Sequence, residues 1–408
     1  MARRQAPPGQ SEVDVGEVSA ADIEEIAARL VEFARPYQAL MQLESQGEHL
    51  GTFLSGLVSG IERKSVEPIA LANGQARGPL QHFVGASTWS ESPILGLLRT
   101  EVAAELGEAD GVLVIDGSGV PKKGRASVGT VRQWCGRLGK VENCQVGIYI
   151  AYAGKGSGVL VDRRLYLPRE WAKDRARRKK THVPKEVRFK KAWELGDELL
   201  LANAGHLPHS WIVADDEYGR CSAFRDLLAS RGERYLMEVP SSTNVRRLRA
   251  EVGRPPGWHA VKVVAKRTPV AEWSRHRVRD GEKGPIEVRA MRVPVETKRR
   301  RGGPVRETLL MMETLDGTER WNFLTNAKDD VPLQDLVRAA SRRHLIEEAF
   351  ELGKGEVGLD HYEVRNWQGW HHHTACALLG GWFLVRESRM LGKKSAGDDC
   401  EPGPVSVE

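Results

Sequence analysis

Two short apolar runs end in acidic residues, and this feature narrows the possible folds more than any other. The run at 112–116 reads VLVID, and the run at 211–216 reads WIVADD. Each has the length of one buried strand, and an acid directly after such a strand lies at the carboxyl edge of the sheet, where α/β sites are built. The runs are far apart in the chain, so only a shared sheet would bring their acids together.

The segments around these runs predict the rest of a core. Strands are expected at 144–154, 159–168 and 234–240, and helices at 184–204 and 218–231. Three successive strands followed by helix, strand, helix and strand imply a mixed sheet with helices on its faces. The predicted class is therefore α/β, with the strand order of a ribonuclease-H-like core.

The basic residues are clustered along the chain, which has 408 residues and a net charge of +6. The clusters lie at 175–180, 246–249 and 298–301. Separate basic clusters fit contact with a polyanion over a long surface, although a basic balance also simply keeps a protein in solution. The candidate phosphate contacts from these clusters are Arg246, Arg247, Arg249, Arg299 and Arg300. Lys122 and Lys123, just after the first acid, are either phosphate contacts or part of a polar turn.

Changes in pattern divide the chain into predicted domains. Residues 21–106 have apolar positions at helical spacing, including two short helices around a glycine-containing turn that fit either a DNA-reading helix-turn-helix or a hairpin that only packs. The predicted divisions are 1–20 disordered, 21–108 a helical DNA-binding domain, 109–240 the first part of the core, 241–328 a β-rich insertion, 329–391 the second part of the core, and 392–408 a tail. Strands within the insertion are expected at 258–265, 286–293, 305–314 and 321–326.

Several lesser features exclude other classes of protein. The five cysteines are widely spaced and form no CxxC pair, so neither a disulfide framework nor a zinc site is expected. No apolar stretch reaches the length of a membrane span, and acidic sequence rather than an apolar segment follows the N-terminal MARRQAPPGQ. A cytoplasmic protein that does not associate with a membrane is therefore predicted. The three histidines at 371–373 are adjacent, lack metal-ligand spacing, and are expected to start the last helix, at 371–390. Trp273 is expected either to pack or to stack on a flipped base.

A third acid is predicted on a helix at 332–353. Around a helix, Arg343, Glu347 and Lys354 fall on one stripe, and Glu348 falls about 100° away from Glu347. Glu347 is therefore the better candidate and Glu348 the alternative, unless the stripe is an ordinary ladder of charges on a solvated face.

Three converging carboxylates suit metal-assisted phosphodiester chemistry. Two metal ions about 4 Å apart can activate a water or a 3′ hydroxyl and stabilise the leaving oxygen. Mg²⁺ prefers carboxylate oxygens, water and phosphate as ligands. Asp116, Asp215 and Glu347 are thus the predicted catalytic and metal-binding residues, with Arg343 and Lys354 placed to contact phosphate.

At these residues the chain resembles bacterial insertion-sequence transposases of the DDE type, within the group that carries a Y-R-E-K signature. VIDGSGVPKKG is similar to the block around the first acid, and VADDEYG to V-A-D-x-x-Y-G, which aligns Asp215 rather than Asp216 with the second acid. RHLIEEAFELGK fits R-x3-E-x6-K, and GEVGLDHYEVRNWQGWHHH is similar to a later block. Two positions depart from the pattern: Ala340 stands where the tyrosine is expected, and Asp216 replaces a small residue.

The resemblance implies a DNA transposase that cleaves transposon ends and carries out strand transfer. It also implies two Mg²⁺ ions, with Mn²⁺ as a substitute, double-stranded DNA ends and target as partners, and a homodimer that joins two ends. The alternatives are a DDE-derived nuclease that cuts without integration and a domesticated DNA-binding repressor.

Overall fold

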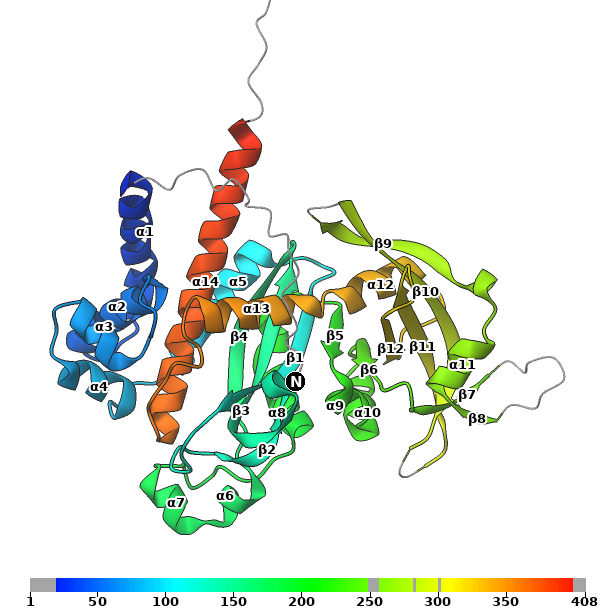
Figure 1. The fold of residues 1–408 in the computed structure, drawn as a ribbon, viewed down its shortest axis with the longest axis horizontal. Helices are drawn as coiled ribbons and strands as arrows, with labels where there is room; N and C mark the ends of the chain where they lie inside the picture. Colours follow the sequence, from blue (N-terminus) through cyan, green and yellow to red (C-terminus); the bar gives the residue numbers. More distant parts are fainter. Residues whose placement is uncertain (1–19, 249–256, 282–283, 300–301, 399–408) are drawn as a thin grey trace, which may run out of the picture.

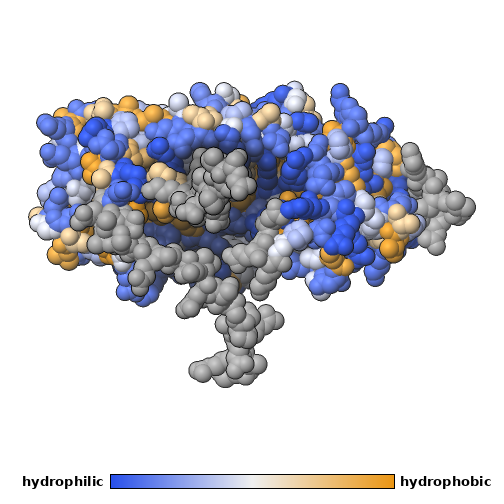
Figure 2. All heavy atoms as spheres, turned by 90° about the horizontal axis from the view of Figure 1, so that it is seen from above, coloured by the Kyte–Doolittle hydropathy of each residue, from blue (hydrophilic) through white to orange (hydrophobic). Residues whose placement is uncertain are grey.

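The computed structural model describes residues 20–248, 257–281, 284–299 and 302–398. A single mixed sheet runs through the molecule, with the N-terminal helices at one end and the β-rich segment at the other (Figure 1). Residues 1–19 of the segment predicted to be disordered (1–20) and the candidates Arg249 and Arg300 lie outside the described residues. The face in Figure 2 is mostly hydrophilic, with hydrophobic residues scattered over it. None of the described helices is long and apolar enough to cross a membrane.

Five strands form the core of the sheet in the order β4-β3-β1-β5-β6. Their bounds are β1 Val112–Pro121, β3 Lys140–Gly154, β4 Ser157–Leu165, β5 Trp211–Ala214 and β6 Tyr235–Glu238. The first three strands in the chain pair antiparallel, whereas β1, β5 and β6 are parallel neighbours. This topology is that of the predicted ribonuclease-H-like α/β class, which is confirmed. The prediction missed β2 Val131–Cys135, which pairs with the start of β3.

The helices of the N-terminal region agree with the predicted pattern. They are α1 Ala20–Gln38, α2 Glu44–Val58, α3 Val66–Ala72, α4 Arg77–Gly85 and α5 Ser92–Leu106. Gly74, between α3 and α4, has a φ of +63°, a conformation that favours glycine and allows the tight turn between the two short helices. Whether this pair reads DNA stays a prediction.

The core sheet is flanked by helices, and several of their predicted bounds were wrong. The observed helices are α6 Arg169–Lys173, α7 Arg175–Lys180, α8 Ala192–Asn203, α9 Asp216–Gly219, α10 Ser222–Ser230, α12 Leu333–Ser341, α13 His344–Gly355 and α14 Trp367–Asp398. The first eight residues of the helix predicted at 184–204 are not helical, because Glu194 caps α8 by accepting from the backbone N–H of Lys191 at 2.7 Å. The tail predicted from 392 is helical as far as Asp398, since α14 continues.

The helix predicted at 332–353 is broken at Arg342 and Arg343. The side chain of Arg342 donates to the carbonyl of Asp110 at 2.7 Å and pairs with Glu108 at 2.8 Å, which fixes the turn between α12 and α13. Ala340 therefore lies in α12, buried at 2% exposure, and does not share a continuous helical stripe with Arg343. The stripe from Arg343 to Lys354 is unaffected, because it belongs to α13 and its cap.

The predicted insertion is β-rich, but its strands continue the core sheet rather than forming a sheet of their own. Its elements are β7 Asn244–Arg247, β8 Trp258–Ala260, α11 Val261–Arg267, β9 Ser274–Gly281, β10 Gly284–Thr297, β11 Val305–Thr314 and β12 Arg320–Thr325. Strand β12 pairs antiparallel with β6, which joins the two parts. The strand predicted at 258–265 was wrong after Ala260, because the buried Val261, Val264 and Ala265 recur at helical spacing and form α11.

The central insertion strands are buried on both faces. Along β11, Leu310 and Met312 belong to the main hydrophobic core, whereas Leu309 and Met311 belong to a separate core beneath α11. Since alternate residues of a strand face opposite ways, this two-sided burial explains the uninterrupted apolar run LLMM.

A buried ionic network centred on Glu307 of β11 connects the insertion to the core. Its carboxylate accepts from Arg225 of α10 at 2.8 Å and from the hydroxyl of Tyr235 of β6 at 2.6 Å, and it pairs with Arg299 at 3.2 Å. Burial by itself raises the pKa of Glu307, but the charges of Arg225 and Arg299 outweigh it and lower the pKa below its ordinary value. Glu307 is thus ionised, and its negative charge is balanced by the two arginines.

Glu307→Ala should lower the free energy of unfolding by about 3–5 kcal/mol, because it leaves two buried guanidinium groups without their counter-ion. Chemical denaturation at neutral pH measures this change. The matched control is Glu363→Ala, which removes an ion pair with Arg63 whose side chains are 58% and 60% exposed, and it should cost less than about 1 kcal/mol. Similar losses in the two variants would contradict a structural role for the network.

Candidate active site

Three acids lie side by side at the carboxyl ends of the parallel strands. Asp116 belongs to β1, Asp215 directly follows β5, and Glu238 ends β6. The residues before them are paired in register: Ile115 with Ala214, and Ala214 with Met237. Because neighbouring strands are about 4.8 Å apart and paired residues face the same way, the three carboxylates form one row on one face of the sheet. We call Asp116, Asp215 and Glu238 the acid row.

Glu238 was not predicted from the sequence, although a signal for it was present. The run RYLME is an apolar strand that ends in an acid, as VLVID and WIVAD do. Its position beside Asp215 became evident only from the strand order.

The two aspartates of the acid row oppose each other's ionisation. Burial and then the charge of Asp215 raise the pKa of Asp116 to about 7, against the opposing charge of Arg343. Burial likewise raises the pKa of Asp215. One oxygen of each group already accepts a backbone N–H: Asp116 from Gly117 at 2.6 Å, and Asp215 from Glu217 at 3.0 Å, as the N-cap of α9. Asp215 thus serves as an N-cap as well as a member of the acid row.

The helix α13 brings Glu347 and Arg343 to the acid row. Its Phe350 packs edge-on against Tyr149, which is paired with Asp116. Arg343 donates to Glu347 at 2.7 Å and pairs with Glu238 at 3.4 Å. Burial lowers the pKa of Arg343, but the surrounding acids, Asp116 first among them, raise it above its ordinary value. Arg343 is thus the counter-ion of four carboxylates.

Glu348, the alternative to Glu347, points elsewhere. Its carboxylate pairs with Arg279 of β9 at 3.0 Å and with His344 at 3.5 Å. The charge of Glu347, by contrast, reaches Asp116 and Glu238.

The chemistry of the acid row fits a divalent metal ion. Its donors are hard carboxylate oxygens, and a cation would relieve the unfavourable burial that raises the pKa values of Asp116 and Asp215. Among the residues with described positions, no three His, Cys, Asp or Glu side chains are already gathered as a ligand set. In this arrangement Glu347 is instead bonded to Arg343.

The sequence of residues 36–290 matches the family described as DDE superfamily endonuclease. This chain belongs to the DDE superfamily. The match includes Asp116, Asp215 and Glu238 but ends before α13, so it does not test the prediction of Glu347.

Among solved structures, this DDE superfamily member resembles a piggyBac transposase in a synaptic complex with hairpin DNA, with 11% identity and a TM-score of 0.44 over 90% of this chain and 74% of that chain. No curated protein matches the sequence.

The lysines proposed to contact phosphate differ in their surroundings. Lys122 donates to the carbonyl of Tyr362 at 3.2 Å and lies 3.7 Å from the centre of its ring, and burial lowers the pKa of Lys122 to about 8. It therefore anchors the segment around Tyr362. Lys123 is exposed. Burial also lowers the pKa of Lys354, which lies over the ring of Phe350 at 5.0 Å and within the field of Asp116.

The arginines proposed from the basic clusters have acidic partners. Arg246 bonds to Glu296 at 2.6 Å, and Arg247 lies 3.8 Å from Glu272. The side chain of Arg299 is 4% exposed and belongs to the Glu307 network, so in this structure its guanidinium contacts carboxylates, and its predicted role as a phosphate contact stays a prediction. A charge cluster in sequence does not reveal which of its members will be buried against an acid.

The remaining aromatic candidates pack inside the protein. Trp273 is partly buried against the core beneath α11. The histidines at 371–373 lie in the first turns of α14 and bond to backbone carbonyl groups.

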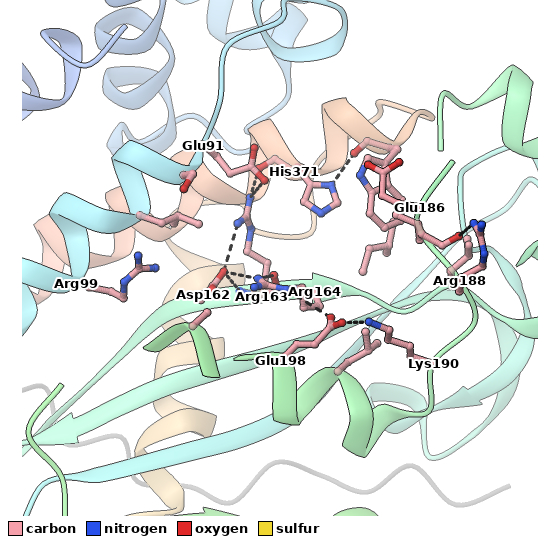
Figure 3. Close-up of a pocket in the computed structure, with 18 residues that line it drawn as sticks. Glu91, Arg99, Asp162, Arg163, Arg164, Glu186, Arg188, Lys190, Glu198 and His371 are labelled. Carbon is pink, nitrogen blue, oxygen red and sulfur yellow. Dashed lines mark hydrogen bonds and ion pairs between the residues drawn. The ribbon is translucent and has the colours of Figure 1, made fainter. Parts of the chain in front are cut away.

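A cavity of about 460 Å³ lies at the β4 edge of the sheet (Figure 3). Arg99 of α5, Asp162 and Arg164 of β4 and Glu198 of α8 are among its lining residues. Their charges are largely compensated within the cavity, since Arg164 pairs with Asp162 at 2.9 Å and with Glu198 at 4.0 Å. None of the acid-row residues lines it.

Asp116→Asn should stabilise the metal-free protein at about pH 8, by on the order of 2 kcal/mol. With a folded-state pKa of about 7, Asp116 keeps its proton at pH values where the unfolded chain has lost it. The free energy of unfolding of wild type therefore falls as the pH rises from about 4 to about 7, and the advantage of the variant shrinks toward about pH 4.

Chemical denaturation in EDTA across this pH range tests the prediction. Asp329→Asn is the control, because that side chain is 66% exposed and its removal should leave the pH dependence unchanged. Parallel pH profiles of wild type and Asp116→Asn would show that the acid row is not under electrostatic strain.

Proposed function

We propose that this protein is a DNA transposase that cleaves transposon ends and joins them to target DNA. Membership of a superfamily of endonucleases supports phosphodiester chemistry. The observation that carries the proposal is the acid row, in which Asp116 and Asp215 lie at the ends of adjacent parallel strands. Glu347 of α13 is joined to this row by Arg343, which donates to it.

Asp116, Asp215 and Glu347 would hold the metal ions through carboxylate oxygens. When bound, two Mg²⁺ ions, or Mn²⁺ in their place, would activate a water or a 3′ hydroxyl and stabilise charge on the leaving oxygen. Asp116 must be deprotonated to act as a ligand, and Glu347 must exchange Arg343 for metal. Glu238, which also pairs with Arg343, would then share in neutralising it.

Arg343 and Lys354 would bind the scissile and flanking phosphates. A guanidinium released from Glu347 offers two parallel N–H donors to phosphate oxygens. Lys354, on the same helical stripe, offers a point charge in a half-buried environment, where electrostatic contacts are strengthened. These residues would position the phosphate for in-line attack by the hydroxyl, with departure of the 3′ oxygen.

Double-stranded DNA is the proposed partner, and two transposon ends would be held by a homodimer. The net charge of +6 favours association with a polyanion. A metal-dependent nuclease that cuts without joining is the nearest alternative, because it would use the same acids.

Adding Mg²⁺ or Mn²⁺ should raise the thermal unfolding midpoint of wild type at about pH 8. At a concentration about ten times the dissociation constant, binding adds about 1.4 kcal/mol to stability. Asp116→Asn should abolish this gain, whereas Asp329→Asn should retain it. The gain should also weaken below about pH 7, because protons compete for Asp116. A gain that is equal in all three proteins would place the metal elsewhere.

Glu347→Gln should abolish Mg²⁺-dependent DNA cleavage, and Glu348→Gln should retain most of it, because Glu347, and not Glu348, is bonded to Arg343 beside the acid row. The substrate is a donor plasmid that carries the gene with its natural flanking sequence, incubated with a target plasmid, and cleavage and joined products are separated on gels. Asp116→Asn and Asp215→Asn should also be inactive. Loss of cleavage in Glu348→Gln alone would reverse the glutamate assignment.

The same reaction separates transposase from nuclease. Products in which donor ends are covalently joined to target DNA support transposition. Cleaved donor without joined products, at equal wild-type activity, would favour the nuclease.

A further inference from the structure

The hairpin formed by β2 and β3 exposes an indole. Trp134 of β2 is 63% exposed, and it is paired directly with Val141 of β3, which is 51% exposed. All eleven tryptophans lie in described parts of the chain, and only Trp134 is exposed to this degree. An exposed indole beside an exposed aliphatic side chain is costly in water, so this apolar pair indicates a contact surface.

This indole lies on the same face of the sheet as Asp116. Paired residues of antiparallel strands share a face, as do residues two apart along one strand. Asp116 is paired with Tyr149, and the same face continues along β3 through residues 147, 145, 143 and 141. Asn143 is paired with Arg132, and Val141 with Trp134. The hairpin thus extends the catalytic face beyond the end of β1.

Contacts of the hairpin turn place it beside α13 as well. Arg137 in the turn is ion-paired with Asp360, which follows α13. Lys354 of α13 lies within the fields of Arg137, Cys135 and Asp116. The hairpin and the acid row therefore flank the same lysine.

The charge around the indole identifies the class of ligand. Residues 121–143 contain one acidic residue, Glu142, and six basic ones: Lys122, Lys123, Arg125, Arg132, Arg137 and Lys140. The bases Lys123, Arg125, Arg132, Arg137 and Lys140 are exposed. An exposed aromatic ring among cationic side chains is the arrangement that binds single-stranded DNA, since the ring stacks on a base and the cations follow the backbone.

We propose that the β2–β3 hairpin is a DNA-binding element that stacks Trp134 on an unpaired base next to the phosphate held at the acid row. The inference rests on the proposed function for the identity of the DNA, but it adds a contact that cleavage chemistry does not require. Unpaired bases would arise at DNA ends as they are cleaved and rejoined. Extraction of such a base from the stack costs free energy that stacking on an indole offsets.

The test uses two synthetic duplexes, one blunt and one with a short unpaired extension that contains 2-aminopurine. Binding is measured by fluorescence anisotropy in EDTA, so that no cleavage occurs, and stacking by quenching of 2-aminopurine. Wild type should prefer the extended duplex by at least about fivefold. Trp134→Ala should lose both the preference and the quenching while its affinity for the blunt duplex stays within about twofold. Trp134→Phe should retain the preference, and Trp273→Ala, the control indole, should behave as wild type.

The outcomes separate this inference from the proposed function. Equal binding of both duplexes by wild type, or an unchanged preference in Trp134→Ala, overturns the hairpin proposal even if the protein cleaves DNA. If Trp134→Ala instead converts a dimer to a monomer with its preference intact, the surface is a contact between two copies and the proposal is overturned. Loss of preference in Trp134→Ala supports it, whether or not cleavage is detected.

Discussion

Parallel pairing of β1, β5 and β6 in one register is the constraint on which the rest of the site depends. It sets Asp116, Asp215 and Glu238 at the same height on neighbouring strands. Burial raises the pKa values of Asp116 and Asp215, and the repulsion between neighbouring carboxylates adds to the cost of ionising them. The fold offsets this cost with the positive charge of a single guanidinium, that of Arg343. Metal ions are suited to replace part of this positive charge.

The route of the chain explains how Arg343 comes to the acid row. After β6 the chain builds the insertion, returns through β12 beside β6, and crosses the sheet as α12 and α13 (Figure 1). The Glu307 network connects β11 to α10 and β6, so the insertion is fixed to the strand that carries Glu238. The break at Arg342 then redirects the chain, and α13 begins with Arg343 as its cap. The insertion thus helps to set the position of α13 through a buried ionic contact and a shared sheet.

Much of this organisation follows from local patterns. The apolar runs before Asp116 and Asp215 are strands because they are short, buried and end at polar residues. The stripe from Arg343 to Glu347 and Lys354 follows from helical periodicity. The break does not disturb it, because Arg343, the N-cap of α13, keeps helical backbone angles. The helix at 261–267 was misread as a strand because a short apolar run is compatible with both structures. Likewise, single helices were predicted where the structure has α9 and α10, and α12 and α13, because the residues on both sides of each break have a helical pattern.

The sequence by itself determined the strand-end aspartates, the candidate glutamate and the α/β class, since these depend on periodicity and residue type within one element. Only the tertiary structure decided that Glu238 joins the acid row, that Arg299 is buried against Glu307, and that Trp134 shares a face with Asp116. Each of these facts depends on which strands are neighbours and in which register they pair. Register is set by contacts between distant segments, and a shift of one residue would turn every side chain to the opposite face.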